Sequence, residues 1–89
     1  MHERRLMREL VGRIEEVAHE EHAVGVSRIR VRLGALSHFT PEHFREHFED
    51  ASRGTSAEGA VVDAVLVEDT GDARAADVVL ESVELEVPD

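Results

Sequence analysis

The sequence predicts an α+β fold of two layers, in which two helices cover one face of a three-stranded mixed sheet in the order α-β-α-β-β. Apolar residues recur at helical spacing over 4–22 and 41–52, and they alternate with polar residues over 27–33. A chain of 89 residues is near the lower size limit for independent folding. We therefore expect residues 1–89 to form one domain around a single small core.

The first predicted helix spans residues 4–22. Arginine and glutamate separate its apolar residues, as in a helix with one buried face. We expect this helix to end near Gly25, because glycine readily adopts the left-handed conformation of a C-terminal cap. The apolar stripe consists of Leu6, Met7, Leu10, Val11, Ile14, Val17 and Ala18.

The first predicted strand spans residues 27–33 and ends at Gly34. Thr40-Pro41 then predicts the start of the second helix, with threonine as the N-cap and proline in the first turn. That helix, 41–52, should bury Phe44 and Phe48. Strict alternation gives the strand an apolar face of Ile29, Val31 and Leu33 and a basic face of Arg28, Arg30 and Arg32.

Two further strands are predicted at residues 59–68 and 77–87. The polar segment 69–76 separates them as a turn, so we expect an antiparallel hairpin. Because a helix connects the first two strands, they should be parallel neighbours or be separated by one strand. Acidic residues of the later strands should lie beside the basic face of the first strand, namely Asp63, Glu84 and Glu86.

The composition excludes several classes of protein. The formal net charge is −10, which argues against nucleic-acid binding, because phosphates would be repelled. There is no cysteine, and therefore no disulfide, thiolate zinc site or cysteine nucleophile. No apolar run is long enough to cross a membrane, and no signal peptide is recognisable, so a cytoplasmic protein is expected. The acidic half, residues 54–89, is either a solvated surface or a patch for a basic partner.

The first three residues, Met1-His2-Glu3, have the chemistry of a metal chelate. The α-amine, a backbone nitrogen and the imidazole of His2 can close chelate rings around one ion, and Glu3 adds a carboxylate or a further backbone nitrogen. A planar nitrogen-rich set of this kind suits Ni(II) or Cu(II) better than zinc or magnesium. The alternative interpretation is an incidental histidine at a frayed terminus.

His43 and His47 match the H-x-x-E-H pattern of inverted zincins, with Glu46 between them. Their i, i+4 spacing places both on one face of the second helix, where an ion could bridge them. The sequence offers no obvious third ligand, however, and the chain is short for a substrate cleft. The alternative is that both histidines border the buried phenylalanines. His19, His22 and His38 are read as solvated helix ends and a loop residue.

Several segments taken together resemble the HypA (HybF) family of hydrogenase nickel-incorporation proteins. The similar segments follow the family's order and cover nearly the whole chain: Met1-His2-Glu3 with Leu6-Met7 and Leu10-Val11, residues 30–37, Pro41-Glu42, Phe48-Glu49, Ser52 to Thr55, Ala57 to Ala60, and Leu80 to Glu86.

The resemblance implies a nickel metallochaperone that is not an enzyme. Family members deliver nickel during maturation of nickel–iron hydrogenase, and in some bacteria urease, together with a nickel-handling GTPase. Their amino-terminal nickel site corresponds here to Met1, His2 and Glu3. The expected cargo is Ni(II), and the expected partners are the GTPase and the hydrogenase large subunit, with this chain as a monomer or homodimer and no membrane or nucleic acid involved.

Two departures from the family are evident. The family carries a zinc domain with two Cys-x-x-Cys pairs between its last two strands, whereas this chain has only the turn 69–76, so no zinc is expected. His43, Glu46 and His47 stand where mainly apolar residues are expected, and the two histidines are candidates for an additional metal contact. Two other hypotheses remain: a protein-binding module with reduced nickel binding, and a metal hydrolase built on His43, Glu46 and His47.

Overall fold

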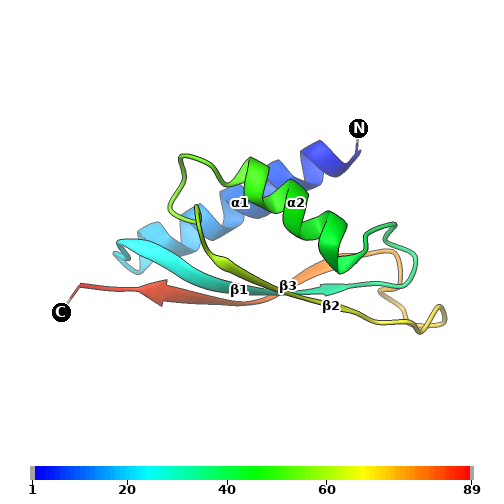
Figure 1. Ribbon diagram of the computed structural model, residues 1–89. Helices are drawn as coiled ribbons and strands as arrows, with labels where there is room; N and C mark the ends of the chain where they lie inside the picture. Colours follow the sequence, from blue (N-terminus) through cyan, green and yellow to red (C-terminus); the bar gives the residue numbers. More distant parts are fainter. Residues whose placement is uncertain (1, 89) are drawn as a thin grey trace.

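The computed structural model of the protein describes residues 2–88, and of His2 only the backbone. Its elements are α1 (His2–Glu20), β1 (Gly25–Leu33), α2 (Pro41–Ala51), β2 (Val61–Leu66) and β3 (Val78–Glu86). Both helices cover the same side of the sheet, and the two ends of the chain lie at opposite ends of the molecule (Figure 1). The predicted fold class and element order are confirmed. Within the described part of the chain, neither helix is both long and apolar enough to cross a lipid bilayer.

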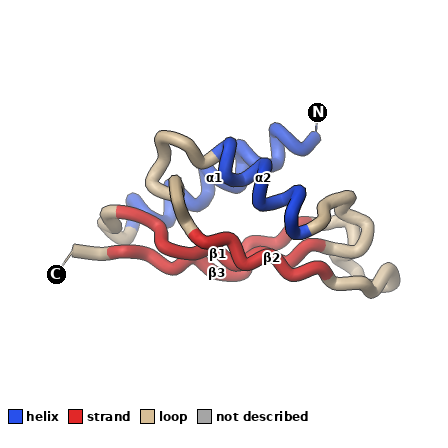
Figure 2. The backbone as a smooth tube through the Cα atoms, in the orientation of Figure 1, coloured by secondary structure: helices blue, strands red, loops and turns tan. Residues whose placement is uncertain are grey.

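The sheet has the strand order β2-β1-β3, so β1 is its central strand. Figure 2 shows the three strands as one layer, with both helices on the same side of it. β1 pairs with β2 in parallel, which is one of the two arrangements expected from the crossover helix. β1 pairs with β3 in the antiparallel direction, and Ile29 lies opposite Val62 on one side and Val83 on the other. The predicted hairpin of the last two strands is therefore wrong.

The segment between β2 and β3 explains this arrangement, because it is held against the end of β1. The N–H of Val67 donates to the carbonyl of Leu33 at 2.9 Å, and that of Gly34 donates to Asp77 at 2.9 Å. The N–H of Leu36 donates to the carbonyl of Ala75 at 2.7 Å. The chain thus crosses the end of the central strand and continues along its free edge, instead of folding back on β2.

The core lies between the helices and the inner face of the sheet. Ile29, Val31 and Leu33 of β1 are completely buried, and so is Phe44 of α2. β1 follows the predicted alternation of apolar and basic faces. From α1 the buried residues are Met7, Leu10, Val11, Ile14 and Ala18, and from α2 they are Phe44 and Phe48.

The outer face of the sheet carries the predicted pairing of basic and acidic strands. These pairs are solvent-exposed, so each contributes at most about 1 kcal/mol. The expected pairing of Glu86 is not found among the described residues, because Glu86 lies opposite Gly25 in the register. The observed pairs are Arg28 with Glu84 at 3.0 Å, Arg30 with Glu81 at 3.7 Å and with Asp63 at 4.0 Å.

The helix ends show one correction and one confirmation. α1 ends at Glu20, and His22, rather than Gly25, adopts the left-handed conformation, with a φ of 56°. The N–H of Ala23 donates to the carbonyl of Ala18, the long bond of a Schellman cap. At α2, Thr40 is the N-cap as predicted.

A partly buried hydrogen-bonded contact ties α1 to the loop after α2. One carboxylate oxygen of Glu15 accepts from the backbone N–H of Ser56 at 2.6 Å and from its hydroxyl at 2.8 Å. The carbonyl of Ser56 in turn accepts from Val26 of β1. The backbone N–H of Ser56, and secondly its hydroxyl, lower the pKa of Glu15 because they stabilise the charged carboxylate.

Replacing Gly34 with alanine should destabilise the fold. A Cβ at position 34 would lie 2.1 Å from the carbonyl oxygen of Ala75, which is backbone and cannot rotate away. We expect a loss of about 1–3 kcal/mol in urea unfolding, as for other overpacked sites. Gly12→Ala is the matched control, since a Cβ there meets nothing within 4 Å, and it should stabilise α1 slightly. Equal effects of the two substitutions would show that the close approach is unimportant.

The free energy of unfolding should decrease in acid, partly because Glu15 becomes protonated. Its pKa is lowered in the folded state, so its contribution is fully present above the ordinary carboxyl pKa and is lost as the pH falls through the lower folded value. Glu15→Gln should cost about 0.5–1 kcal/mol near neutral pH, and this difference should disappear as the pH falls through the lowered pKa of Glu15. Urea unfolding of both proteins across this range tests the prediction, with the exposed Glu20→Gln as control. A difference that is independent of pH would contradict it.

Candidate metal centre

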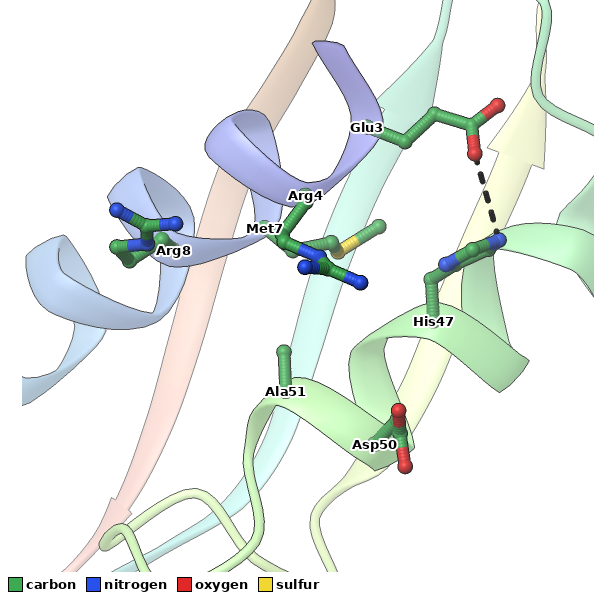
Figure 3. A pocket seen from close by; sticks show the side chains of 7 residues that line it. All are labelled: Glu3, Arg4, Met7, Arg8, His47, Asp50 and Ala51. Carbon is green, nitrogen blue, oxygen red and sulfur yellow. Dashed lines mark ion pairs between the residues drawn. The ribbon is translucent and has the colours of Figure 1, made fainter. Parts of the chain in front are cut away.

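Three potential metal ligands meet where α1 and α2 face each other. They are Glu3 from the first turn of α1 and His43 and His47 from α2, and one ligand atom from each lies within 4.8 Å of the others. The Nε2 atoms of the two histidines are 2.7 Å apart. The Nε2 atom of His47 lies 3.5 Å from a carboxylate oxygen of Glu3. Figure 3 shows Glu3 and His47 pointing toward each other across the gap between the helices.

The way α2 begins and packs explains this placement. Thr40 accepts a hydrogen bond from the backbone N–H of His43, which fixes the first turn, and His47 follows one turn later on the same face. Met7 and Ala51 line the same pocket between the helices, each one turn after Glu3 and His47 respectively. Where Met7 and Ala51 face each other, the helices approach closely, and the preceding turns, which carry Glu3 and His47, therefore also come together.

The aromatic ring of Phe39 packs beside both imidazoles. Its centroid lies 5.6 Å from that of His43 and 6.4 Å from that of His47, and Phe39 itself is buried. The side chains of Glu3 and His47 remain about two-fifths exposed, at 41% and 39%. The cluster is thus bordered by an apolar ring on one side and is open to solvent on the other.

The pocket beside the cluster is charged. Apart from the residues already named, Arg4, Arg8 and Asp50 line it, and Arg8 lies toward the end away from His47 (Figure 3). Glu3 also lines a second pocket, together with the loop that contains His38. Glu3 is therefore the side chain that borders both hollows at this end of the molecule.

Two imidazole nitrogens and one carboxylate oxygen form a ligand set that suits divalent ions of the later first-row metals. Glu46, the acidic residue of the H-x-x-E-H pattern, is exposed and does not belong to the cluster. The carboxylate that meets the histidines is that of Glu3. The third potential ligand is therefore Glu3 of the other helix and not the acidic residue of the motif.

The structure describes only part of the predicted amino-terminal nickel site. Met1 lies outside the described residues, and the backbone of His2 begins α1. Only Glu3 has a described side chain, and it faces α2 rather than solvent alone. The amino-terminal nickel site itself stays a prediction.

Sequence reasoning identified His43 and His47 as a pair but found no third ligand for them. The structure supplies Glu3, which is 40 positions away from His43 and joins it only through the crossing of the helices. The sequence held one relevant pattern. Glu3 lies four residues before Met7 on the first helix, and His47 lies four residues before Ala51 on the second, so contact between Met7 and Ala51 would bring Glu3 and His47 together. Within residues 3–88 the group of potential ligands does not include His19, His22 or His38.

Comparison with known proteins identifies a family. The family described as hydrogenase/urease nickel incorporation, metallochaperone, HypA matches residues 1–87. Hydrogenase maturation factor HypA of Methylocella silvestris is 42% identical over 67 residues, which are 75% of this chain and 59% of that protein. HypA of Archaeoglobus fulgidus is 38% identical over 60 residues, 67% of this chain and 54% of that protein. The matched region thus spans less than two thirds of the length of these relatives.

The fold agrees with a solved structure. The solution structure of the Ni metallochaperone HypA from Helicobacter pylori superposes with a TM-score of 0.77 at 17% identity, covering 97% of this chain and 98% of that one. At this identity the likeness establishes the fold alone.

The sequence contains no cysteine, so it lacks the Cys-x-x-Cys pairs that the family resemblance implies. Since the family match covers nearly the whole sequence, the chain belongs to the HypA family of hydrogenase and urease nickel-incorporation metallochaperones.

Proposed function

We propose that this chain carries Ni(II) as cargo at Met1, His2 and Glu3 and helps to insert it during maturation of nickel–iron hydrogenase or urease. The observation that carries the proposal is the family match over residues 1–87, which includes the Met-His-Glu start. The chain has no catalytic task in this proposal: it binds the ion and releases it to a partner.

The position of α1 supports the amino-terminal site. The helix begins at His2, and the first four N–H groups of a helix have no acceptor within it. The amide nitrogens of His2 and Glu3 can therefore serve as metal ligands without breaking a helix hydrogen bond. Together with the α-amine and an imidazole they give the planar nitrogen set that Ni(II) prefers.

The helix dipole is compatible with a cation at this site. The positive end of a helix disfavours a bound cation by about 0.3–1 kcal/mol, and an acidic residue in the first turn offsets that effect. Glu3 is the acidic residue in the first turn of α1. The two effects therefore largely cancel, and the position at the helix start does not oppose nickel binding.

The proposed partners are a nickel-handling GTPase and the large subunit of the client enzyme. The described start of α1 lies at one end of the molecule, away from the outer face of the sheet, where a partner protein can reach it (Figure 1). The second half has ten acidic residues and one arginine in residues 54–89, and this excess of negative charge would attract a basic partner. Part of it is already paired within the chain, since Asp63, Glu81 and Glu84 form ion pairs with arginines of β1.

Nickel titration of the untagged protein tests the proposal. We expect the absorbance of a planar Ni(II) complex in the native chain, and its loss in His2→Ala, because the substitution removes the imidazole ligand. His19→Ala is the matched control, an exposed histidine in the last turn of the same helix.

Acetylation of Met1, or a tag of several residues before it, should also abolish the planar spectrum, because it converts the α-amine of Met1 into an amide. An unchanged planar spectrum in His2→Ala would overturn the site assignment. Binding of a maturation GTPase or client subunit that survives His2→Ala, with no planar nickel complex in the native chain, would favour the protein-binding module instead.

A further inference from the structure

We propose that Glu3, His43 and His47 form a second metal site, built from side chains alone, that takes a divalent late first-row ion, Ni(II) or Zn(II). This site does not require a free amino terminus. It goes beyond the proposed function and shares only Glu3 with the amino-terminal motif.

The distances between the ligand atoms fit one shared ion. Metal–nitrogen and metal–oxygen bonds of about 2.0–2.2 Å place neighbouring ligand atoms about 3 Å apart. The observed separations are 2.7 Å between the two Nε2 atoms and 3.5 Å between Nε2 of His47 and the oxygen of Glu3. The third pair, from His43 and Glu3, lies within 4.8 Å. Small side-chain rotations therefore suffice for all three atoms to face one centre.

The two histidines occupy positions from which they can act together. They lie one turn apart on α2, whose start is fixed by the Thr40 cap and by Pro41. The buried ring of Phe39 packs against both imidazoles and restricts their orientation. A site whose ligands are held before binding loses less conformational entropy when an ion arrives.

Three protein ligands leave at least one coordination position open. The open side faces solvent, since Glu3 and His47 are partly exposed. Sites with an open position exchange ligands, whereas closed four-ligand sites are structural. The cluster is thus suited to hold an ion reversibly, beside the terminus at which nickel is proposed to bind.

The simpler explanation is a hydrogen-bonded cluster that only joins the two helices. At 2.7 Å, one imidazole nitrogen must donate its hydrogen and the other must accept it. The two explanations differ in one measurable respect, because only the metal site makes both nitrogens available to an ion at the same time.

The test uses the full chain extended by an acetyl group on the amine of Met1 (the extended chain), so that this amine is blocked as a ligand while all side chains remain. Isothermal titration with NiSO₄ and, separately, ZnCl₂ measures binding. We expect the extended chain to bind one ion and the extended His43→Gln/His47→Gln variant to bind none. The extended His19→Gln variant is the matched control and should behave as the extended parent does. Of the two ions, the one bound more tightly identifies the preferred metal.

Two further measurements keep the outcome clear. Far-UV circular dichroism checks that the double variant folds, which is expected because glutamine is a good helix former. In the extended chain, Glu3→Gln should weaken binding by at least about tenfold, since even the loss of an outer partner of a metal ligand commonly costs that much.

The result separates the two proposals. Binding to the extended chain that requires His43 and His47 supports the side-chain site, whether or not the native chain forms a planar nickel complex. Absence of binding to the extended chain, or binding that the double variant retains, overturns the side-chain site and leaves the amino-terminal proposal untouched. A third outcome is also possible. If the extended chain binds no ion, and His43→Gln/His47→Gln abolishes the planar complex of the native chain, the two histidines are ligands of the terminal site. That result likewise overturns a separate side-chain site.

Discussion

The central strand β1 is the constraint on which the rest of the structure depends. Ile29, Val31 and Leu33 are completely buried on its inner face, and both of its edges are hydrogen-bonded to neighbouring strands. A three-stranded sheet with one apolar face must bury that face under the only two helices available, so both helices pack on the same side. Their packing around Met7 is what brings the first turn of α1 to the middle of α2, where Glu3 meets His47.

Local chemistry was sufficient to predict the elements, but it could not predict the order of the strands. The Thr40-Pro41 start of α2 and the alternation of β1 are encoded in adjacent residues, and both are confirmed. The pairing of β3 depends on which edge of β1 the chain reaches after residue 66. That is decided by the hydrogen bond between Leu36 and Ala75 and by the missing side chain at Gly34, a contact between segments some 40 residues apart. A polar turn between two strands is equally compatible with a hairpin and with this crossing.

The same distinction applies to the candidate metal centre. His43 and His47 could be paired from the sequence, because helical spacing alone places them on one face. Glu3 could not be assigned to them, because its position relative to α2 follows from the packing of two separate helices. The left-handed conformation at His22 was missed for a related reason: the sequence pointed to the nearest glycine, whereas the hydrogen bond from Ala23 to Ala18 fixes the turn two to three residues earlier. In each case the residue type was informative and the tertiary contact decided its role.

Glu3 can contribute to both proposed sites because its two functional groups point in different directions. Its backbone nitrogen belongs to the first turn of α1, where a helix leaves N–H groups unpaired, and so it is available to an ion at the amino terminus. Its carboxylate extends toward His47 on the other helix (Figure 3). An ion at the terminus that uses the backbone nitrogen leaves the carboxylate free, whereas one that uses the carboxylate competes with the histidines for it. In the planar nitrogen site proposed above, the two sites would therefore fill independently. Only a terminal ion that also took the carboxylate would be coupled to the occupancy of the cluster, and by linkage that coupling would act equally in both directions. In the proposed nickel carrier, a carboxylate shared in this second way would loosen one ion when another arrives.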